Sequence, residues 1–252
     1  MGVATAATRA GSLREIALTS HSTFLAIAKD PAIIPGVHHH CDEWCDYCLV
    51  TNRCLAFKCT AEHRRREGLA EGEPTFRSLD EAVAFTRSVA EAEGESTPEL
   101  DALVAEGAER AGLRTADPLA GEALEYALRV SIGFAPIAEL VTRAPIRRSG
   151  PEPPEVLLWY HVRIYLRLVR ALVAREGRGP GRNRMDDANG SAKLVLVAIQ
   201  KSRAAIAQMQ ANEPTDDFTA LMMALVTLER GIEERFPDAR TYLRIGLDVP
   251  VI

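Results

Sequence analysis

The pattern of hydrophobic and polar positions is helical along most of this chain. Apolar residues recur every three or four positions from Leu13 to Ala28, which predicts a first helix in that segment. The same periodicity runs through longer segments from residue 118 onwards, and prolines or glycines near their ends mark where helices start and stop. These longer helices are predicted over residues 118–142, 154–176, 187–210 and 215–236. Because no alternating strands with hairpin turns compete with this pattern, the sequence predicts an all-α fold.

Two shorter helices are predicted upstream of the long ones. Ser78 and Glu81 have the spacing of a capping box, which indicates a helix over residues 79–93. Pro98 occupies the first position of a second helix over residues 98–111, where its missing N–H removes no hydrogen bond. Together with the first helix, these are the additional N-terminal helices of the expected architecture.

The similar lengths of the four long segments predict how they pack. A helix of about 22 residues is about 33 Å long, and helices of similar length with short connections typically form an antiparallel bundle. The sequence therefore predicts a four-helix bundle with a Cys-rich metal-binding loop. We expect a disordered N-terminus over residues 1–11, an N-terminal helix and the Cys-rich segment over 12–74, and the helical bundle domain over 75–252.

Composition and charge narrow the classes of function. The chain has 252 residues, of which 47% are hydrophobic, enough to bury a sizeable core. Asp and Glu number 35 against 30 Lys and Arg, giving a formal net charge of −5, so nucleic-acid binding is not expected. No apolar run approaches the roughly 20 residues of a membrane-spanning helix, and the N-terminus lacks the apolar core of a signal peptide. We therefore expect a cytoplasmic protein without a membrane partner.

Clustered cysteines are the chemical feature that stands out. The chain has five cysteines, spaced C-x3-C-x2-C-x5-C-x4-C directly after the run His38, His39 and His40. They are Cys41, Cys45, Cys48, Cys54 and Cys59. Disulfides are disfavoured because cytoplasmic thiols stay reduced, and so many thiols beside charged neighbours do not fit a hydrophobic core. The segment therefore predicts a metal centre.

The part of this segment with the spacing C-x2-C-x5-C, followed by Leu-x-Phe, resembles two iron–sulfur motifs. It is similar to the [4Fe–4S] site of WhiB-like regulators and to the iron staple of AddB- and Cas4-type nucleases, where an upstream cysteine completes the set. The resemblance implies a [4Fe–4S] cluster held by Cys45, Cys48 and Cys54, with Cys41 as the upstream ligand. The whole chain also resembles uncharacterised bacterial helical proteins with an N-terminal cysteine knot, which implies no activity.

Zinc is the alternative ion for the same segment. Structural zinc sites usually combine two short chelating units, and this chain has a single C-x2-C. A histidine such as His40 could supply a nitrogen ligand, although the histidine run also fits a solvated loop, and Cys59 could replace another thiolate. The chain would then be a zinc-stapled helical module that binds a protein partner and has no catalytic activity.

Apolar residues within the segment have two possible uses. They could wrap a cluster and limit its contact with water, or dock the segment onto the helices. These residues are Trp44, Tyr47, Leu49, Val50, Leu55 and Phe57. Arg53 and Lys58 could offset the negative charge of the thiolates.

A third interpretation is an enzyme that uses a pocket of the bundle. His161 and Tyr165 lie opposite a stripe of arginines that includes Arg163 and Arg167, and Glu229 falls within the apolar stripe of the last long helix. A buried carboxylate must be paired, protonated or bound to metal. His161, Tyr165 and Glu229 are therefore candidates for a second polar site, or else a hydrogen-bond network in the core. The sequence identifies no catalytic residue, no particular protein or small-molecule partner and no oligomeric state.

Overall fold

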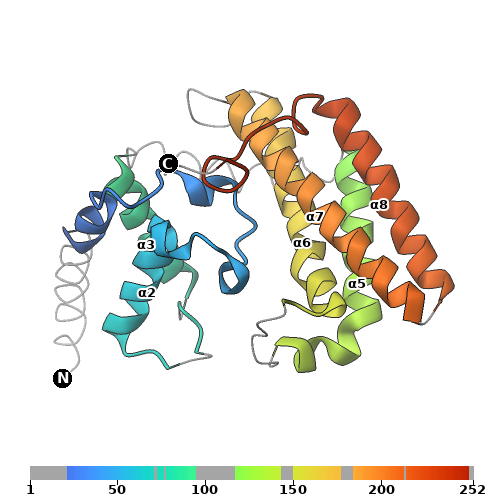
Figure 1. Cartoon of the computed structure of the whole chain (residues 1–252), viewed down its shortest axis with the longest axis horizontal. Coiled ribbons are helices and arrows are strands. Elements are labelled where there is room, and N and C mark those ends of the chain that lie inside the picture. Colours follow the sequence, from blue (N-terminus) through green and yellow to red (C-terminus); the bar gives the residue numbers. More distant parts are fainter. Residues whose placement is uncertain are drawn as a thin grey trace, which may run out of the picture. The chain divides into compact units, whose positions relative to one another are not determined.

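Helices dominate the computed structural model of the chain (Figure 1), as the hydrophobic pattern predicts. The structure describes residues 22–70, 73–76, 78–94, 117–142, 150–176, 184–212 and 214–249. Within these ranges the β-pairing consists of one isolated bridge between Ile245 and Val249. The predicted disordered segment 1–11 and short helix 98–111 lie outside the described residues. None of the described helices combines the length and apolar character that crossing a membrane requires.

Internal contacts divide the chain into two compact units. The N-terminal unit comprises residues 1–39, 48–104 and 245–252, and the long-helix unit comprises residues 40–47 and 105–244. The sequence pattern predicts a different boundary, near residue 75, between the Cys-rich segment and the bundle domain.

Short helices build the N-terminal unit. The described part has helical residues 22–28, and then η1 (Val37–His40), η3 (Thr51–Arg53), α2 (Leu55–Glu67) and α3 (Leu79–Glu93). The last residue of η1, His40, is already part of the long-helix unit. The hydroxyl of Ser78 accepts a hydrogen bond from the amide of Glu81, which is the cap expected at the start of α3. Helices α2 and α3 both end at a glycine in the left-handed region, where a side chain would be strained.

Helix α2 was not predicted from the sequence. Its buried positions are Leu55 and Cys59, and the charged residues that fill its last turns hide this sparse apolar pattern. Two small hydrophobic clusters stabilise the unit. One contains Phe24, Ile33, Leu55, Cys59, Val89 and Ala92, and the other contains Ile34, Val37 and Cys54. The last two cysteines of the segment are therefore part of the packed interior.

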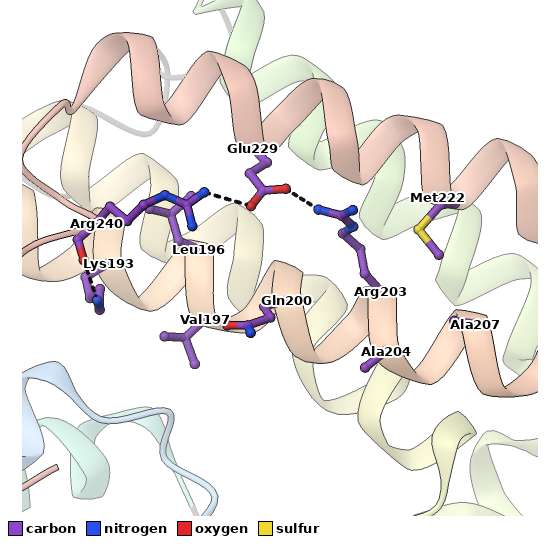
Figure 2. Close-up of a pocket in the computed structure, with 10 residues that line it drawn as sticks. All are labelled: Lys193, Leu196, Val197, Gln200, Arg203, Ala204, Ala207, Met222, Glu229 and Arg240. Atoms are coloured by element: carbon purple, nitrogen blue, oxygen red, sulfur yellow. Dashed lines mark hydrogen bonds and ion pairs between the residues drawn. The ribbon is translucent and has the colours of Figure 1, made fainter. Parts of the chain in front are cut away.

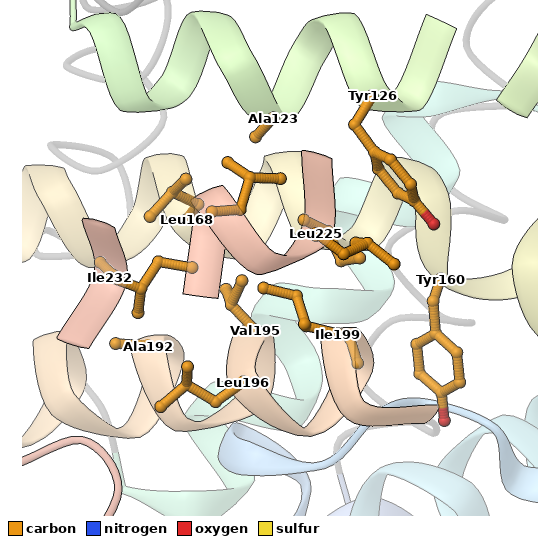
Figure 3. Close-up of a cluster of buried hydrophobic side chains, with 14 of the residues drawn as sticks. Ala123, Tyr126, Tyr160, Leu168, Ala192, Val195, Leu196, Ile199, Leu225 and Ile232 are labelled. Carbon is orange, nitrogen blue, oxygen red and sulfur yellow. The ribbon is translucent and has the colours of Figure 1, made fainter. Parts of the chain in front are cut away.

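Four helices form the described body of the long-helix unit. They are α5 (Pro118–Thr142), α6 (Pro153–Arg175), α7 (Arg184–Asn212) and α8 (Asp216–Arg235), close to the predicted ranges. Helix α6 packs against α5 and α7, and α8 packs against the same two helices. Their apolar faces meet in one core (Figure 3), to which α5 contributes Tyr126, α6 Leu168, α7 Ile199 and α8 Leu225. Full burial of each such side chain contributes about 1.5–3 kcal/mol to folding.

Candidate metal centre

The cysteines of the segment belong to different units. Cys41 and Cys45 are in the long-helix unit and are partly exposed, whereas Cys48, Cys54 and Cys59 are in the N-terminal unit. Cys48 is partly exposed, and the other two are buried. None of these five described cysteines forms a disulfide.

Asp42 attaches the start of the segment to the long helices. Its Oδ2 accepts hydrogen bonds from the Tyr160 hydroxyl at 2.6 Å and from Lys201 Nζ at 2.8 Å. Its backbone carbonyl accepts a third from Trp159 Nε1 at 3.1 Å. Burial alone would raise the pKa of Asp42, but the hydrogen bonds from Lys201 and Tyr160 outweigh burial and lower that pKa. The carboxylate is therefore charged at neutral pH.

Trp44 provides the apolar part of this attachment. It is 9% exposed and stacks on Trp159, with ring centroids 4.9 Å apart and an interplanar angle of 14°. Its edge also meets Tyr160 at 5.6 Å and Tyr47 at 5.1 Å. The Arg163 guanidinium lies 3.6 Å from the centroid of the Trp159 ring, a cation–π contact. Of the two uses predicted for the apolar residues, Trp44 and Tyr47 dock the segment, because both pack on the core of the long helices.

Glu43 lies between these two anchors in an unusual backbone conformation. Its φ of 60° is in the left-handed region, which costs free energy for a residue with a side chain. The carboxylate pairs with Arg167, and it is 3.8 Å from Arg163 Nε. The arginine stripe of α6 thus binds the segment. Cys41 and Cys45 flank three anchored residues, so their backbone positions are fixed on the long-helix unit.

Other residues of the segment are placed less centrally. Leu49 is 97% exposed and Phe57 is 38% exposed, so neither side chain is packed into the core of its own unit. Arg53 donates a hydrogen bond to the carbonyl of Ala32 at 3.0 Å, and Lys58 pairs with Asp30 at 2.9 Å. These two cations therefore fix the loop after the first helix.

The buried thiols of the N-terminal unit are held in their protonated form. Burial raises the pKa of Cys59 to about 12, and the nearby charge of Glu93 adds to the shift. Burial likewise raises the pKa of Cys54, although backbone N–H groups of Phe57 and Ala56 at the start of α2 act in the opposite direction. A bound metal ion would favour the thiolate form of either sulfur.

Two histidines of the run meet a glutamate that the sequence analysis did not identify. Nε2 of His38 and Nε2 of His39 lie 3.6 Å and 3.3 Å from the same oxygen, Oε2 of Glu93. The possible ligand atoms of these three residues all lie within 4.8 Å of one another. Burial lowers the pKa of His38, which favours the neutral imidazole. Glu93 stands four positions after the buried Val89 on α3, a pattern that could have marked it as facing inwards.

His40, the histidine proposed as a metal ligand, has a different environment. It belongs to the long-helix unit, and its ring lies edge-on to Tyr242 with centroids 5.4 Å apart. Gly190 of α7 approaches the same ring so closely that an added Cβ would lie 2.4 Å from it. His40 is therefore packed against α7 and the segment that follows α8.

The predicted polar residues His161, Tyr165 and Glu229 are also located. His161 and Tyr165 are partly buried at the edge of the α6 core face, because the centre of that face passes through Tyr160, Ile164 and Leu168. Burial lowers the pKa of His161. Glu229 is 19% exposed and forms ion pairs with Arg203 and Arg240, so this carboxylate is compensated by arginines.

A groove of about 460 Å³ lies beside Glu229, between α7 and α8 (Figure 2). Lys193, Arg203 and Arg240 line it together with Glu229, and Leu196 and Met222 add apolar surface. Its described lining does not include His161. Because cations outnumber the carboxylate, the groove suits a small anion with an apolar part.

No protein-family model, curated protein or solved structure matches this chain. The function must therefore be argued from its own residues.

Proposed function

We propose that this chain is a metal-binding protein that carries a [4Fe–4S] cluster ligated by Cys41, Cys45, Cys48 and Cys54. The observation that carries the proposal is the concentration of five cysteines in residues 41–59, with the C-x2-C-x5-C spacing. Four thiolates are the ligand set of such clusters, and the ligands can be spread loosely around the large cubane.

The attachment of residues 42–47 supports a positioned cysteine segment. Asp42 and Trp44 fix the backbone between Cys41 and Cys45 through a partly buried hydrogen-bond network and a stacked indole pair. Lys201, Arg163 and Arg167 pair with Asp42 and Glu43, so these two carboxylates would add little to the negative charge of a thiolate-ligated cluster. In this proposal the long helices α5–α8 form an antiparallel four-helix bundle that supports the cluster.

The cluster would have a redox, sensing or structural role. A redox or sensing role requires that the cluster changes oxidation state or is lost in air without unfolding the chain. A structural role requires that loss of the cluster lowers the free energy of unfolding. The alternative is a zinc ion on the same cysteines, in a non-catalytic module that binds a protein partner.

A small-molecule site is the third candidate, and the groove beside Glu229 supports it. Its cations and apolar side chains could bind an acidic metabolite, and an enzyme could act on such a ligand there. The described lining of the groove includes no nucleophile in contact with a base, so we assign no reaction to it.

The test of the proposal is anaerobic purification of the untagged chain, followed by a visible spectrum and analysis of iron, sulfide and zinc. The proposal predicts a brown protein with about four irons and four sulfides per chain, whose colour bleaches on reduction or in air. A colourless protein with one zinc and no sulfide would overturn the cluster and support the zinc module.

A further inference from the structure

We propose that His38, His39 and Glu93 form a separate mononuclear site for a zinc-type divalent ion. The site lies wholly within the N-terminal unit. The site uses none of the cysteines assigned to the cluster, so the proposal of this site does not depend on the proposed function.

The distances between the two histidines and Glu93 fit ligands that share one ion. An N–H···O hydrogen bond usually spans about 2.7–3.2 Å. The 3.6 Å between His38 Nε2 and Glu93 Oε2 exceeds this range, whereas His39 Nε2, at 3.3 Å from the same oxygen, is within reach of a long hydrogen bond. Two ligand atoms that each lie about 2.0–2.1 Å from a tetrahedral zinc ion are about 3.3–3.4 Å apart. Both nitrogens therefore stand at nearly the separation from the carboxylate that co-ligation requires.

The local backbone explains why two adjacent histidines can reach one carboxylate. Gly36 has a φ of 65°, in the left-handed region, and the tight η1 turn starts directly after it. The amide of His39 donates to the carbonyl of Gly36 at 3.0 Å, which fixes the turn. The two imidazole rings then lie 4.4 Å apart at an angle of 74°. Glu93 faces them from the last turn of α3.

The donor set and its exposure specify the class of ion. Two imidazole nitrogens and one carboxylate oxygen are the ligands of open zinc sites, in which water takes the fourth position. The side chains of His38, His39 and Glu93 are 19%, 39% and 16% exposed, so the site is sheltered but reachable by an ion. Calcium and magnesium prefer oxygen ligands and do not fit this set.

The same unit contains a matched control. His63 Nε2 lies 3.5 Å from Glu81 Oε1, with comparable exposures of 15% and 28%. This pair has one histidine and one carboxylate, and the described residues add no third possible ligand to it. An ordinary His–Glu ion pair would behave like this control, whereas a metal site would not.

The test is titration of the untagged, full-length chain with Zn²⁺ by calorimetry and with Co²⁺ by absorption spectroscopy. His39→Ala and Glu93→Gln should each weaken one binding event by at least about 100-fold, the upper end of what even outer-shell changes cost. His63→Ala should leave it unchanged. Cobalt at this site should show weak visible bands, and the intense near-ultraviolet band of thiolate ligation should be absent.

A final experiment repeats the cobalt titration with the double variant Cys45→Ser/Cys48→Ser, which lacks two of the proposed cluster ligands. The weak visible bands should persist in this variant even if the cluster is lost. The proposal of this site would be wrong if these bands were lost. It would also be wrong if zinc bound equally well to His39→Ala, Glu93→Gln and His63→Ala. The His39 side chain is more exposed than that of Glu93, so His39→Ala still tests the site if Glu93→Gln fails to fold. Circular dichroism checks that each variant is helical.

Discussion

Replacement of Asp42 by alanine tests whether the cysteine segment is held on the long helices as described. The change removes the acceptor for the Tyr160 hydroxyl, on a residue that is 1% exposed, and the partner of Lys201. The hydroxyl still accepts a hydrogen bond from Lys201 Nζ at 2.9 Å, but its own O–H is left without an acceptor, which costs about 1–3 kcal/mol. The Lys201 side chain is 49% exposed, so its ion pair adds at most about 1 kcal/mol. We expect Asp42→Ala to lower the free energy of unfolding by about 2–3 kcal/mol.

The assay is urea unfolding followed by tryptophan fluorescence and by circular dichroism in parallel. The chain has two tryptophans, Trp44 and Trp159, and they are the stacked pair, so fluorescence reports on the anchor itself. Circular dichroism reports on the helices. In Asp42→Ala the fluorescence transition should move to lower urea. Asp46→Ala, an exposed carboxylate four residues on, is the matched control and should change neither transition. Coincident, unshifted transitions in Asp42→Ala would refute the anchoring argument.

Three further predictions follow from the same contacts. The pKa of Asp42 is lower in the folded state, so its charge stabilises the fold above a pH of about 4, and this contribution is lost as the pH falls through the folded pKa. The difference in unfolding free energy between the wild type and Asp42→Asn should therefore be larger at pH 7 than at about pH 3. A difference that stays constant with pH would contradict this prediction. Gly190→Ala should destabilise the chain by about 1–3 kcal/mol in urea unfolding, because the new Cβ would lie 2.4 Å from the His40 ring. Gly121→Ala is the control, since an added Cβ there meets no heavy atom within 4 Å, and it should be neutral or stabilising. Glu229→Gln should cost about 1 kcal/mol or less, since Arg203 and Arg240 are 39% and 61% exposed; a loss several times larger in thermal unfolding would show that the carboxylate is a core element.

The long helices could be predicted from the sequence because their apolar periodicity is strong and their ends are marked. Helix α3 begins at the predicted cap, and α5 has the predicted bounds. Helix α2 could not be predicted in the same way, since it buries only Leu55 and Cys59 and carries charged residues along most of its length. The stability of this helix depends on its packing against other parts of the unit, which the local hydrophobic pattern does not indicate.

The contacts around the candidate sites were harder to predict because their partners are distant in the chain. Arg163 and Arg167 lie on the predicted arginine stripe, but their partner Glu43 lies more than a hundred positions earlier in the chain. The requirement that Glu229 be compensated was correct; its partner Arg203 emerged only from the packing of α8 against α7, and its partner Arg240 lies in the segment after α8. Glu93 was missed for the same reason, since its neighbours His38 and His39 precede it by more than fifty positions.

The central claim is that the cysteines hold an iron–sulfur cluster, and iron and sulfide content in cysteine variants tests it most directly. Cys45→Ser and Cys48→Ser remove proposed ligands, and Cys59→Ala removes the cysteine that the proposal leaves out. After anaerobic purification, the wild type and Cys59→Ala should each contain about four irons and four sulfides per chain, and the two serine variants should contain far less. Equal iron and sulfide in all four proteins, or none in the wild type, would contradict the account.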